Sequence, residues 1–154
     1  MSDVLDYYKG IIDEAELSKE RAAVDGLKLK NKLSVLIVDD CPLTRASYRR
    51  LLIRLGINNF QEAKTGREAV DLCQSGEIFD LILMDLVMPV MKGPQATKML
   101  RQMGVSSVIF GVTATSRGPE TEAFMDSGLN DWIEKPLTLL ALVDILRDVD
   151  NLER

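Results

Sequence analysis

Short apolar runs alternate along the chain with longer segments of helical periodicity. Five of the runs have the length of buried strands, at residues 34–38, 60–63, 80–84, 107–112 and 131–134. Continuous apolar runs of this kind are typical of a parallel sheet that is covered on both faces. The pattern therefore predicts an α/β domain in which helices flank a buried sheet.

The segments between the runs carry the signals of amphipathic helices. In residues 42–56 the apolar residues, such as Tyr48, share one face, whereas the arginines, Arg45 among them, fall elsewhere. Thr65 and Glu68 have the spacing of a capping box at the start of the next helix. The further helices are predicted at residues 65–76, 94–104, 119–128 and from residue 139 onward.

The alternating order of these strands and helices predicts a doubly wound sheet. Right-handed crossovers make all strands parallel and bring their C-terminal ends to one edge. We expect a flavodoxin-like (βα)5 fold with the strand order 2-1-3-4-5, in which the first and third strands are neighbours where the order reverses. Ligands bind at that point in doubly wound sheets.

Residues 1–32 form a charged segment ahead of the first strand, so we divide the chain into this N-terminal extension and a domain at residues 33–154. Leu5, Tyr8, Ile12 and Ala15 fall on one helical face. A short helix and a Lys-rich linker are therefore predicted. A surface helix and a contact with a second copy or a partner both remain open.

The composition excludes several classes of protein. A net charge of −5 and a pI near 4.8 argue against a DNA-binding protein, which needs a basic face. No signal peptide or membrane-spanning run is present, so we expect a soluble protein of the cytoplasm, with the nucleus left open. Cys41 and Cys73 are expected to be reduced thiols. The absence of histidine excludes Ser-His-Asp and Cys-His nucleophile pairs, so any phosphate chemistry falls to carboxylates.

Three carboxylates follow the ends of two predicted strands. Asp39 and Asp40 come directly after residues 34–38, and Asp85 comes directly after residues 80–84. Neighbouring strands lie about 4.8 Å apart, so three ionised carboxylates there would repel one another unless a cation joined them. Ligation by oxygen alone selects a hard cation, and Mg2+ is the one we expect.

Other residues at the same edge suit phosphoryl transfer. Asp85 is a candidate nucleophile, because a carboxylate can take a phosphoryl group as an acyl phosphate when a metal neutralises the incoming oxygens. Lys135, after the fifth strand, would add positive charge. Thr113 and the amide of Ala114 could donate hydrogen bonds to the remaining phosphoryl oxygens. The sequence therefore predicts a phosphoryl acceptor with Asp85, Thr113 and Lys135 as its reactive centre.

Four motifs carry a resemblance to a known family. They are VLIVDD at residues 35–40, FDLILMDLVMPVMKG at 79–93, VTA at 112–114 and EKP at 134–136. In this order and spacing, the chain resembles the receiver domain of two-component response regulators over residues 33–150. The resemblance implies that Asp85 is the phosphoacceptor. It also implies that Asp39, Asp40, Asp85 and the carbonyl of Val87 bind Mg2+.

The same resemblance implies roles for the residues that face the phosphoryl group. Thr113 would be the switch hydroxyl and would bind phosphate together with the amide of Ala114 and with Lys135. Trp132 stands three positions before Lys135, where receivers carry an aromatic residue that moves with the switch hydroxyl. These assignments agree with the chemistry expected from the residues themselves.

Within the family, the phrases GVTA and SGLNDWIEKPLT are most similar to plant receivers, especially the type-C single-domain regulators of phosphorelays. That likeness implies a stand-alone receiver in cytokinin-type signalling. Its phosphate would come from the phosphohistidine of a histidine-containing phosphotransfer protein or a histidine kinase. It would be a signal carrier or a phosphate drain, as a monomer or weak dimer. It would be a phosphoacceptor rather than an enzyme, with phosphohistidine phosphatase activity on a partner left open.

Three positions depart from the common receiver pattern. Cys41 stands where a third acidic residue is frequent, and it is either a small residue before Pro42 or a redox-sensitive thiol. Val87 cannot hydrogen-bond a hydrolytic water, so we expect slow loss of the acyl phosphate. Trp132 is bulkier than the usual Tyr or Phe, so a switching role and simple packing on the last helix both remain open.

Alternative interpretations remain for the site as a whole. Acidic residues often end strands without further function. A phosphatase of the haloacid dehalogenase type would need two Asp separated by one residue, but Leu86 and Val87 follow Asp85. A pseudo-receiver that binds partners without phosphorylation is a third possibility, and the complete set of site residues argues against it.

Overall fold

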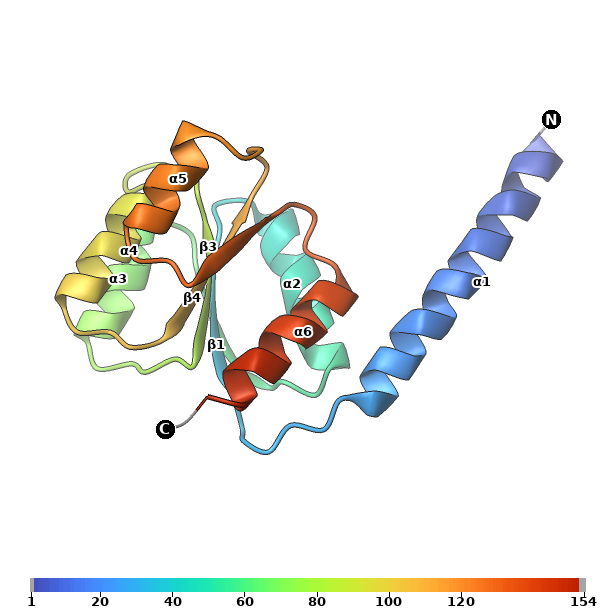
Figure 1. Cartoon of the computed structure of the whole chain (residues 1–154), viewed down its shortest axis with the longest axis horizontal. Helices are drawn as coiled ribbons and strands as arrows, with labels where there is room; N and C mark the ends of the chain where they lie inside the picture. The colour runs from blue at the N-terminus through green and yellow to red at the C-terminus, as the bar shows by residue number, and fades with distance from the viewer. Residues whose placement is uncertain (1, 153–154) are drawn as a thin grey trace.

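Five parallel strands form the central sheet of the structure, a computed structural model that describes residues 2–152 and, for residues 2–12, the backbone alone (Figure 1). Their order is β2-β1-β3-β4-β5, as predicted. The observed bounds agree with the predicted strands to within one residue at each end. The strands are β1 Ser34–Val38, β2 Asn59–Ala63, β3 Leu81–Asp85, β4 Val108–Thr113 and β5 Asp131–Glu134.

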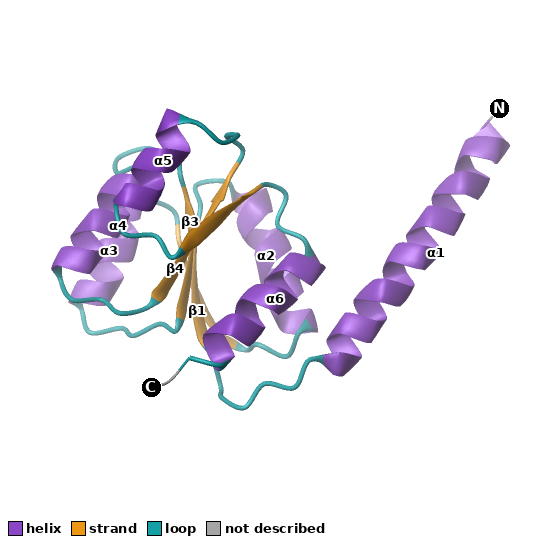
Figure 2. Ribbon diagram, in the orientation of Figure 1, coloured by secondary structure: helices purple, strands orange, loops and turns teal. Residues whose placement is uncertain are grey.

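Helices cover both faces of this sheet (Figure 2). One face carries α3, α4 and α5, and the other carries α2 and α6 (Figure 1). This is the flavodoxin-like doubly wound arrangement that the alternating pattern predicts. The helices are α1 Ser2–Gly26, α2 Pro42–Arg54, α3 Gly66–Gln74, α4 Gly93–Gln102, α5 Pro119–Asp126 and α6 Leu139–Asp150.

The side chains of β1 alternate between two hydrophobic cores. Val35 and Ile37 pack with α2 and α6, whereas Leu36 and Val38 pack with α3, α4 and α5. All four side chains are buried, which explains why the strand reads as one continuous apolar run. The first polar residue after the run, Asp39, is therefore placed at the C-terminal edge of the sheet.

The N-terminal segment begins with helix α1, which projects away from the sheet (Figure 1). The prediction of a short helix is wrong, because α1 continues for 25 residues, up to the start of the linker. Of the predicted helical face, the side chains of Leu5, Tyr8 and Ile12 lie outside the described part of the chain, and Ala15 is exposed. Near the end of α1, Glu20 forms an ion pair with Arg54 of α2 at 2.7 Å. None of the helices within residues 2–152 combines the length and apolarity needed to cross a membrane.

The linker after α1 is held against the end of α6. One carboxylate oxygen of Asp150 accepts the amide of Lys30 at 2.7 Å, and the other accepts the amide and side-chain nitrogen of Asn31 at 3.0 and 2.9 Å. Asp150 is buried, so these donors replace the water that its charge would otherwise need. The contacts join segments that are far apart in the sequence.

The predicted capping box of α3 forms in one direction only. The hydroxyl of Thr65 accepts the amide of Glu68 at 3.1 Å, as the spacing predicts. The carboxylate of Glu68, however, accepts the amide of Lys64 at 2.6 Å, one residue before the capping residue. The long side chain of Glu68 reaches past Thr65 to the amide of Lys64, and the amide of Glu68 at the helix start still has the Thr65 hydroxyl as its acceptor.

Candidate functional site

The three carboxylates singled out in the sequence lie together at the C-terminal edge of the sheet. Carboxylate oxygens of Asp39, Asp40 and Asp85 all lie within 4.8 Å of one another. β1 and β3 are hydrogen-bonded neighbours, so their C-terminal ends lie side by side. Asp39 and Asp85 are buried, and Asp40 is exposed to solvent. The cluster is therefore open on the side of Asp40.

Asp39 is fixed by partners on several segments. Its amide donates to the carbonyl of Ala63 on β2 at 3.1 Å. One carboxylate oxygen accepts the amide of Cys41 at 2.9 Å, and the other accepts the ammonium of Lys135 at 2.8 Å. The turn that carries the acidic pair is thus tied to the sheet and to the segment after β5.

Lys135 lies between two of the carboxylates. Its Nζ is 2.8 Å from Asp39 and 3.4 Å from Asp85. Burial alone would lower the pKa of Lys135, but the hydrogen bond to Asp39 and the charges of Asp85 and Asp39 raise it above its usual value. The lysine is therefore a fixed positive charge beside the acidic cluster.

Asp85 carries the clearest sign of electrostatic crowding. Burial, followed by the nearby charge of Asp39, raises the pKa of Asp85 to about 6. Lys135 and the amide of Leu86 act in the opposite direction without restoring the ordinary value. A cation placed among the carboxylates would relieve this repulsion and favour the ionised, nucleophilic form of Asp85.

Thr113 and Ala114 lie at the end of the neighbouring strand. In the register of β3 and β4, Asp85 is paired with Val112, so Thr113 follows directly beside the acceptor strand. Thr113 is buried, and its hydroxyl accepts the amide of Thr115 at 3.0 Å. Ala114 is exposed at the start of the loop. Both residues are at the edge where the sequence places them.

The loop after β3 packs closely against the backbone of Asp85. A Cβ atom on Gly93 would collide with the carbonyl of Asp85, so this position requires glycine. The amide of Gly93 donates to the carbonyl of Leu86 at 3.0 Å. Val87 is 57% exposed and Val90, also exposed, has a positive φ of 72°. The loop that follows Asp85 thus exposes two valines to solvent.

Trp132 is half-buried on the face of the sheet that carries α5. It packs against the core that contains Phe124 and Leu129, and it lines a groove of about 350 Å³ that also includes Arg117 and Met125. The predicted alternative, packing on the last helix, is wrong, because α6 covers the opposite face. A half-buried residue on an edge strand can face either side of the sheet, so the sequence alone does not show which helix Trp132 packs against.

The donor set at this edge suits a hard divalent cation. Every candidate ligand from the acidic cluster is a carboxylate oxygen, and no thiolate belongs to it. Mg2+ prefers oxygen ligands and keeps several waters, which an open cluster allows. Asp39, Asp40 and Asp85 are the residues that could hold it, and the carbonyl of Val87 lies two positions after Asp85.

Comparison with known proteins agrees with this geometry. Residues 35–147 match the response regulator receiver domain. The chain belongs to this family. Two-component response regulator 24 of Arabidopsis thaliana is 48% identical over 121 residues, which cover 79% of this chain and 86% of that protein. The resemblance to plant single-domain response regulators is therefore confirmed.

Solved structures of receiver domains share the fold. The receiver domain of the sensor histidine kinase PA1611 from Pseudomonas aeruginosa, solved with magnesium in its active-site cleft, aligns with a TM-score of 0.68 and 27% identity, covering 78% of this chain and 98% of that one. A second match is a co-crystal structure of the Saccharomyces cerevisiae phosphotransfer protein Ypd1 with the receiver domain of Ssk1. It aligns with a TM-score of 0.71 and 31% identity, covering 80% of this chain and 92% of that one. This receiver is thus a signalling domain of the two-component type.

The structure also places at the site an arginine that helical periodicity assigns to a polar helix face. Arg45 is 9% exposed, and its guanidinium donates to the backbone carbonyl of Asp39 at 2.7 Å. Helical periodicity locates the Cα of an arginine, but a long side chain can reach back over the preceding turn. Only the position of Arg45, six residues after Asp39, hinted at this contact.

Proposed function

We propose that this receiver accepts a phosphoryl group on Asp85 from a phosphohistidine, with Mg2+ bound by Asp39, Asp40, Asp85 and the carbonyl of Val87. The observation that supports it most is the carboxylate cluster within 4.8 Å, with Lys135 in contact with two of its members. When bound, Mg2+ neutralises negative charge on the transferring group. No step needs a histidine from this chain.

The reaction at Asp85 transfers the phosphoryl group from an imidazole nitrogen of the donor to a carboxylate oxygen. A carboxylate oxygen of Asp85 forms a P–O bond as the P–N bond to the donor imidazole breaks, and the imidazole leaves with the electron pair and takes up a proton. Lys135, the hydroxyl of Thr113 and the amide of Ala114 bind the remaining phosphoryl oxygens. The Thr113 oxygen accepts the amide of Thr115, so its own O–H is available to donate to a phosphoryl oxygen.

The donor would approach from the side of α2. Leu43 at the start of that helix is 82% exposed. It lines a groove of about 340 Å³ with Tyr48, Lys135 and Leu137, so a residue of the site is part of the groove wall. A phosphotransfer protein or a histidine kinase is the partner that we propose, and the Ypd1 co-crystal structure of a similar receiver supports the first of these.

Transfer to Asp85 can be tested without knowledge of the natural donor. We expect phosphoramidate, which carries the same P–N bond as phosphohistidine, to phosphorylate the wild-type protein in the presence of Mg2+, as measured by intact mass spectrometry. Asp85→Asn should show no such mass increase, and chelation of the metal should suppress it in the wild type. Equal labelling of Asp85→Asn, or none of the wild type by this donor and by phosphorylated Ypd1, would favour the pseudo-receiver.

The lifetime of the acyl phosphate would decide between a signal carrier and a phosphate drain. Val87 presents no polar group to a hydrolytic water, which supports a slow loss and hence a carrier. Val87→Asn should therefore shorten the half-life of phosphorylated protein, measured by following the mass increase after donor removal. An unchanged half-life would contradict this role of Val87.

Trp132 would report the phosphorylated state. It is the single tryptophan of the chain, and it lies beside Gly111 on β4, the strand that ends at Thr113. If Thr113 moves toward the phosphoryl group, the packing of Trp132 should change, and so should its fluorescence. A constant emission spectrum upon addition of Mg2+ and beryllofluoride, a phosphoryl mimic, would assign Trp132 to packing alone.

We also propose the biological setting and the division of the chain. The plant relatives support a phosphorelay of the cytokinin type, in the cytoplasm or nucleus. Residues 33–154 would form the receiver, as a monomer or weak dimer, and residues 1–32 would form an extension with its own role. Phosphohistidine phosphatase activity toward a partner would follow if the acyl phosphate on Asp85 is short-lived.

A further inference from the structure

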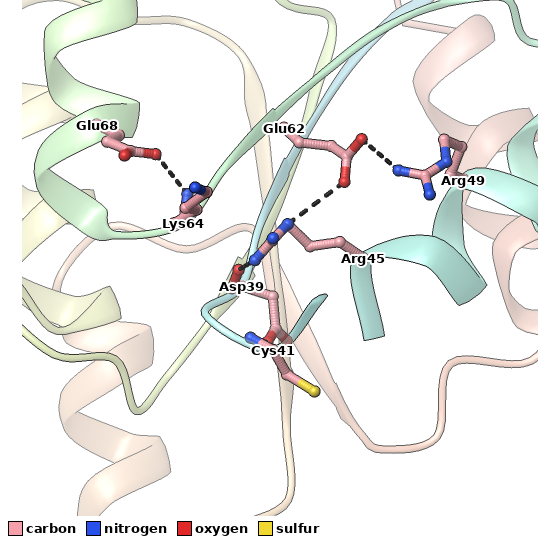
Figure 3. Close-up of polar contacts among 7 residues, drawn as sticks. All are labelled: Asp39, Cys41, Arg45, Arg49, Glu62, Lys64 and Glu68. Atoms are coloured by element: carbon pink, nitrogen blue, oxygen red, sulfur yellow. Dashed lines mark hydrogen bonds and ion pairs between the residues drawn. The ribbon is translucent and has the colours of Figure 1, made fainter. Parts of the chain in front are cut away.

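A buried arginine connects the acidic turn to the neighbouring strand. Arg45 lies one turn into α2, and its side chain points back toward Asp39 and Glu62 (Figure 3). Its Nη1 donates to the carbonyl of Asp39 at 2.7 Å, and its Nε lies 3.3 Å from a carboxylate oxygen of Glu62. A charged group with a side chain only 11% exposed needs such partners to remain buried.

Glu62 is itself held in place on both sides. It lies on β2, where it pairs in register with Ile37 of β1, so its backbone belongs to the sheet. Its second carboxylate oxygen accepts from Arg49, one helical turn after Arg45, at 2.6 Å (Figure 3). Arg45 therefore bridges a strand of the sheet to the turn that carries Asp39.

The carbonyl that Arg45 holds belongs to the peptide group between Asp39 and Asp40. A peptide group is rigid and planar, so fixing its oxygen also fixes where the Cα of Asp40 lies. Asp39 is held by three other contacts as well, to Ala63, Cys41 and Lys135. Asp40 is exposed at the open side of the cluster, so the direction of its carboxylate depends on the backbone before it.

We propose that Arg45, anchored by Glu62, is a positioning residue for the metal site and orients the Asp39–Asp40 peptide so that the carboxylate of Asp40 points at the cation. This inference rests on the proposed function, because it assumes that the acidic cluster binds a divalent cation. Arg45 does not touch the metal or the phosphoryl group. It acts on affinity by preorganising a ligand that is exposed at the surface.

The sign of the effect separates positioning from simple electrostatics. Removal of a positive charge next to three carboxylates should by itself strengthen their attraction for a cation. If Arg45 acts by orientation, its removal should instead weaken cation binding. The loss of an outer-shell partner of a metal ligand typically weakens affinity by about 10- to 100-fold.

The experiment is a titration with Mn2+, which prefers the same oxygen ligands as Mg2+, with free Mn2+ measured by electron paramagnetic resonance. We expect Arg45→Met to bind Mn2+ about tenfold more weakly than the wild type. Arg45→Lys keeps the charge but cannot reach the carbonyl of Asp39 and Glu62 at once, so it should lose about threefold. Arg49→Gln, which loses a partner of Glu62 without contact to Asp39, should change the affinity less than about twofold.

The outcomes separate this inference from the proposed function. Wild-type binding that Asp40→Asn greatly weakens supports the metal site, and a wild-type chain that binds no Mn2+ would overturn both. If the wild type binds and folded Arg45→Met binds as well or better, the positioning role alone is overturned. Should Arg45→Met fail to fold by circular dichroism, Arg45→Lys decides, and wild-type affinity in that variant would overturn the inference.

Discussion

Carboxylates lie at both ends of the central sheet, and they are surrounded by different partners. At the end of the sheet where the strands begin, Asp80 accepts the amide of Ser34 at 2.8 Å, and nearby Asp150 accepts amides of the linker. At the other end, Asp39, Asp40 and Asp85 lie near one another, with Lys135 as a shared cation. Asp80 and Asp150 each accept hydrogen bonds from backbone amides, whereas two of the three clustered carboxylates have Lys135 as their ion-pair partner.

The pKa values follow this difference. The amide of Lys30, together with the contacts from Asn31, lowers the pKa of Asp150. Burial and the charge of Asp39 raise that of Asp85 to about 6. The ionised form is therefore favoured by folding at one end and penalised at the other. Under the proposed function, the charge left unfavourable at this site is what a bound cation and phosphoryl group would relieve.

The largest effect is expected from Asp85→Asn in the absence of divalent metal. The cost of ionising Asp85 in the folded protein disappears in this variant, so we expect the free energy of unfolding at pH 7 to rise by about 2 kcal/mol. Urea denaturation with a chelator present measures it. Mg2+ should stabilise the wild type much more than this variant, and equal stabilisation by Mg2+ would remove Asp85 from the metal site.

The pH dependence of the same difference gives an independent check. The pKa of Asp85 is raised from 3.8 to about 6, so above pH 4 the unfolded carboxyl ionises before the folded one. The wild type should therefore lose stability as the pH rises from about 4 to about 6, and should lose no more above that range. Asp85→Asn should show no such loss. A gap between the two proteins that persists below pH 4 would point to packing rather than charge.

A smaller effect of the opposite sign is expected at the other end, from Asp150→Ala. Its carboxylate satisfies the linker amides, and burying these without an acceptor is unfavourable, so we expect the melting temperature to fall. Thermal unfolding followed by circular dichroism tests this. Because the pKa of Asp150 is lowered, its contribution should be present at neutral pH and lost as the pH falls below its ordinary value near 3.8. Asp148→Ala, an exposed change on the same helix, is the matched control.

The smallest effect is expected in the loop beside the site. Val90 has a φ of 72°, a conformation that is unfavourable for a β-branched residue and free of cost for glycine. After subtraction of the entropy that glycine loses on folding, Val90→Gly should stabilise the protein by about 0.5 kcal/mol. The exposed neighbour Val87 lacks this conformation, so Val87→Gly should destabilise it. If Val90→Gly and Val87→Gly changed the free energy of unfolding in the same direction, the backbone at Val90 would not be strained.

The sequence was sufficient for the sheet and for the acidic cluster, because both follow from periodicity and strand order. Continuous apolar runs locate the strands, and right-handed crossovers bring Asp39 and Asp85 to one edge. It was insufficient for Arg45, whose contacts depend on how far its side chain reaches back over the preceding turn. It was also insufficient for Trp132, whose contacts depend on which face of the edge strand carries its side chain. The contact of Asp150 with Lys30 and Asn31 leaves no pattern at all, because it joins distant segments by single hydrogen bonds.

The contact between Asp150 and the linker also has a mechanical consequence. Force applied to α1 would pass along the linker and meet Lys30 and Asn31, which are fastened to the end of α6, before it reached β1. Tension would thus be borne in part by α6 and shared with the core beneath it. Less of a force on the N-terminal helix would therefore reach the acidic turn at Asp39 through the linker and β1, and the ion pair between Glu20 and Arg54 would carry part of that force into α2.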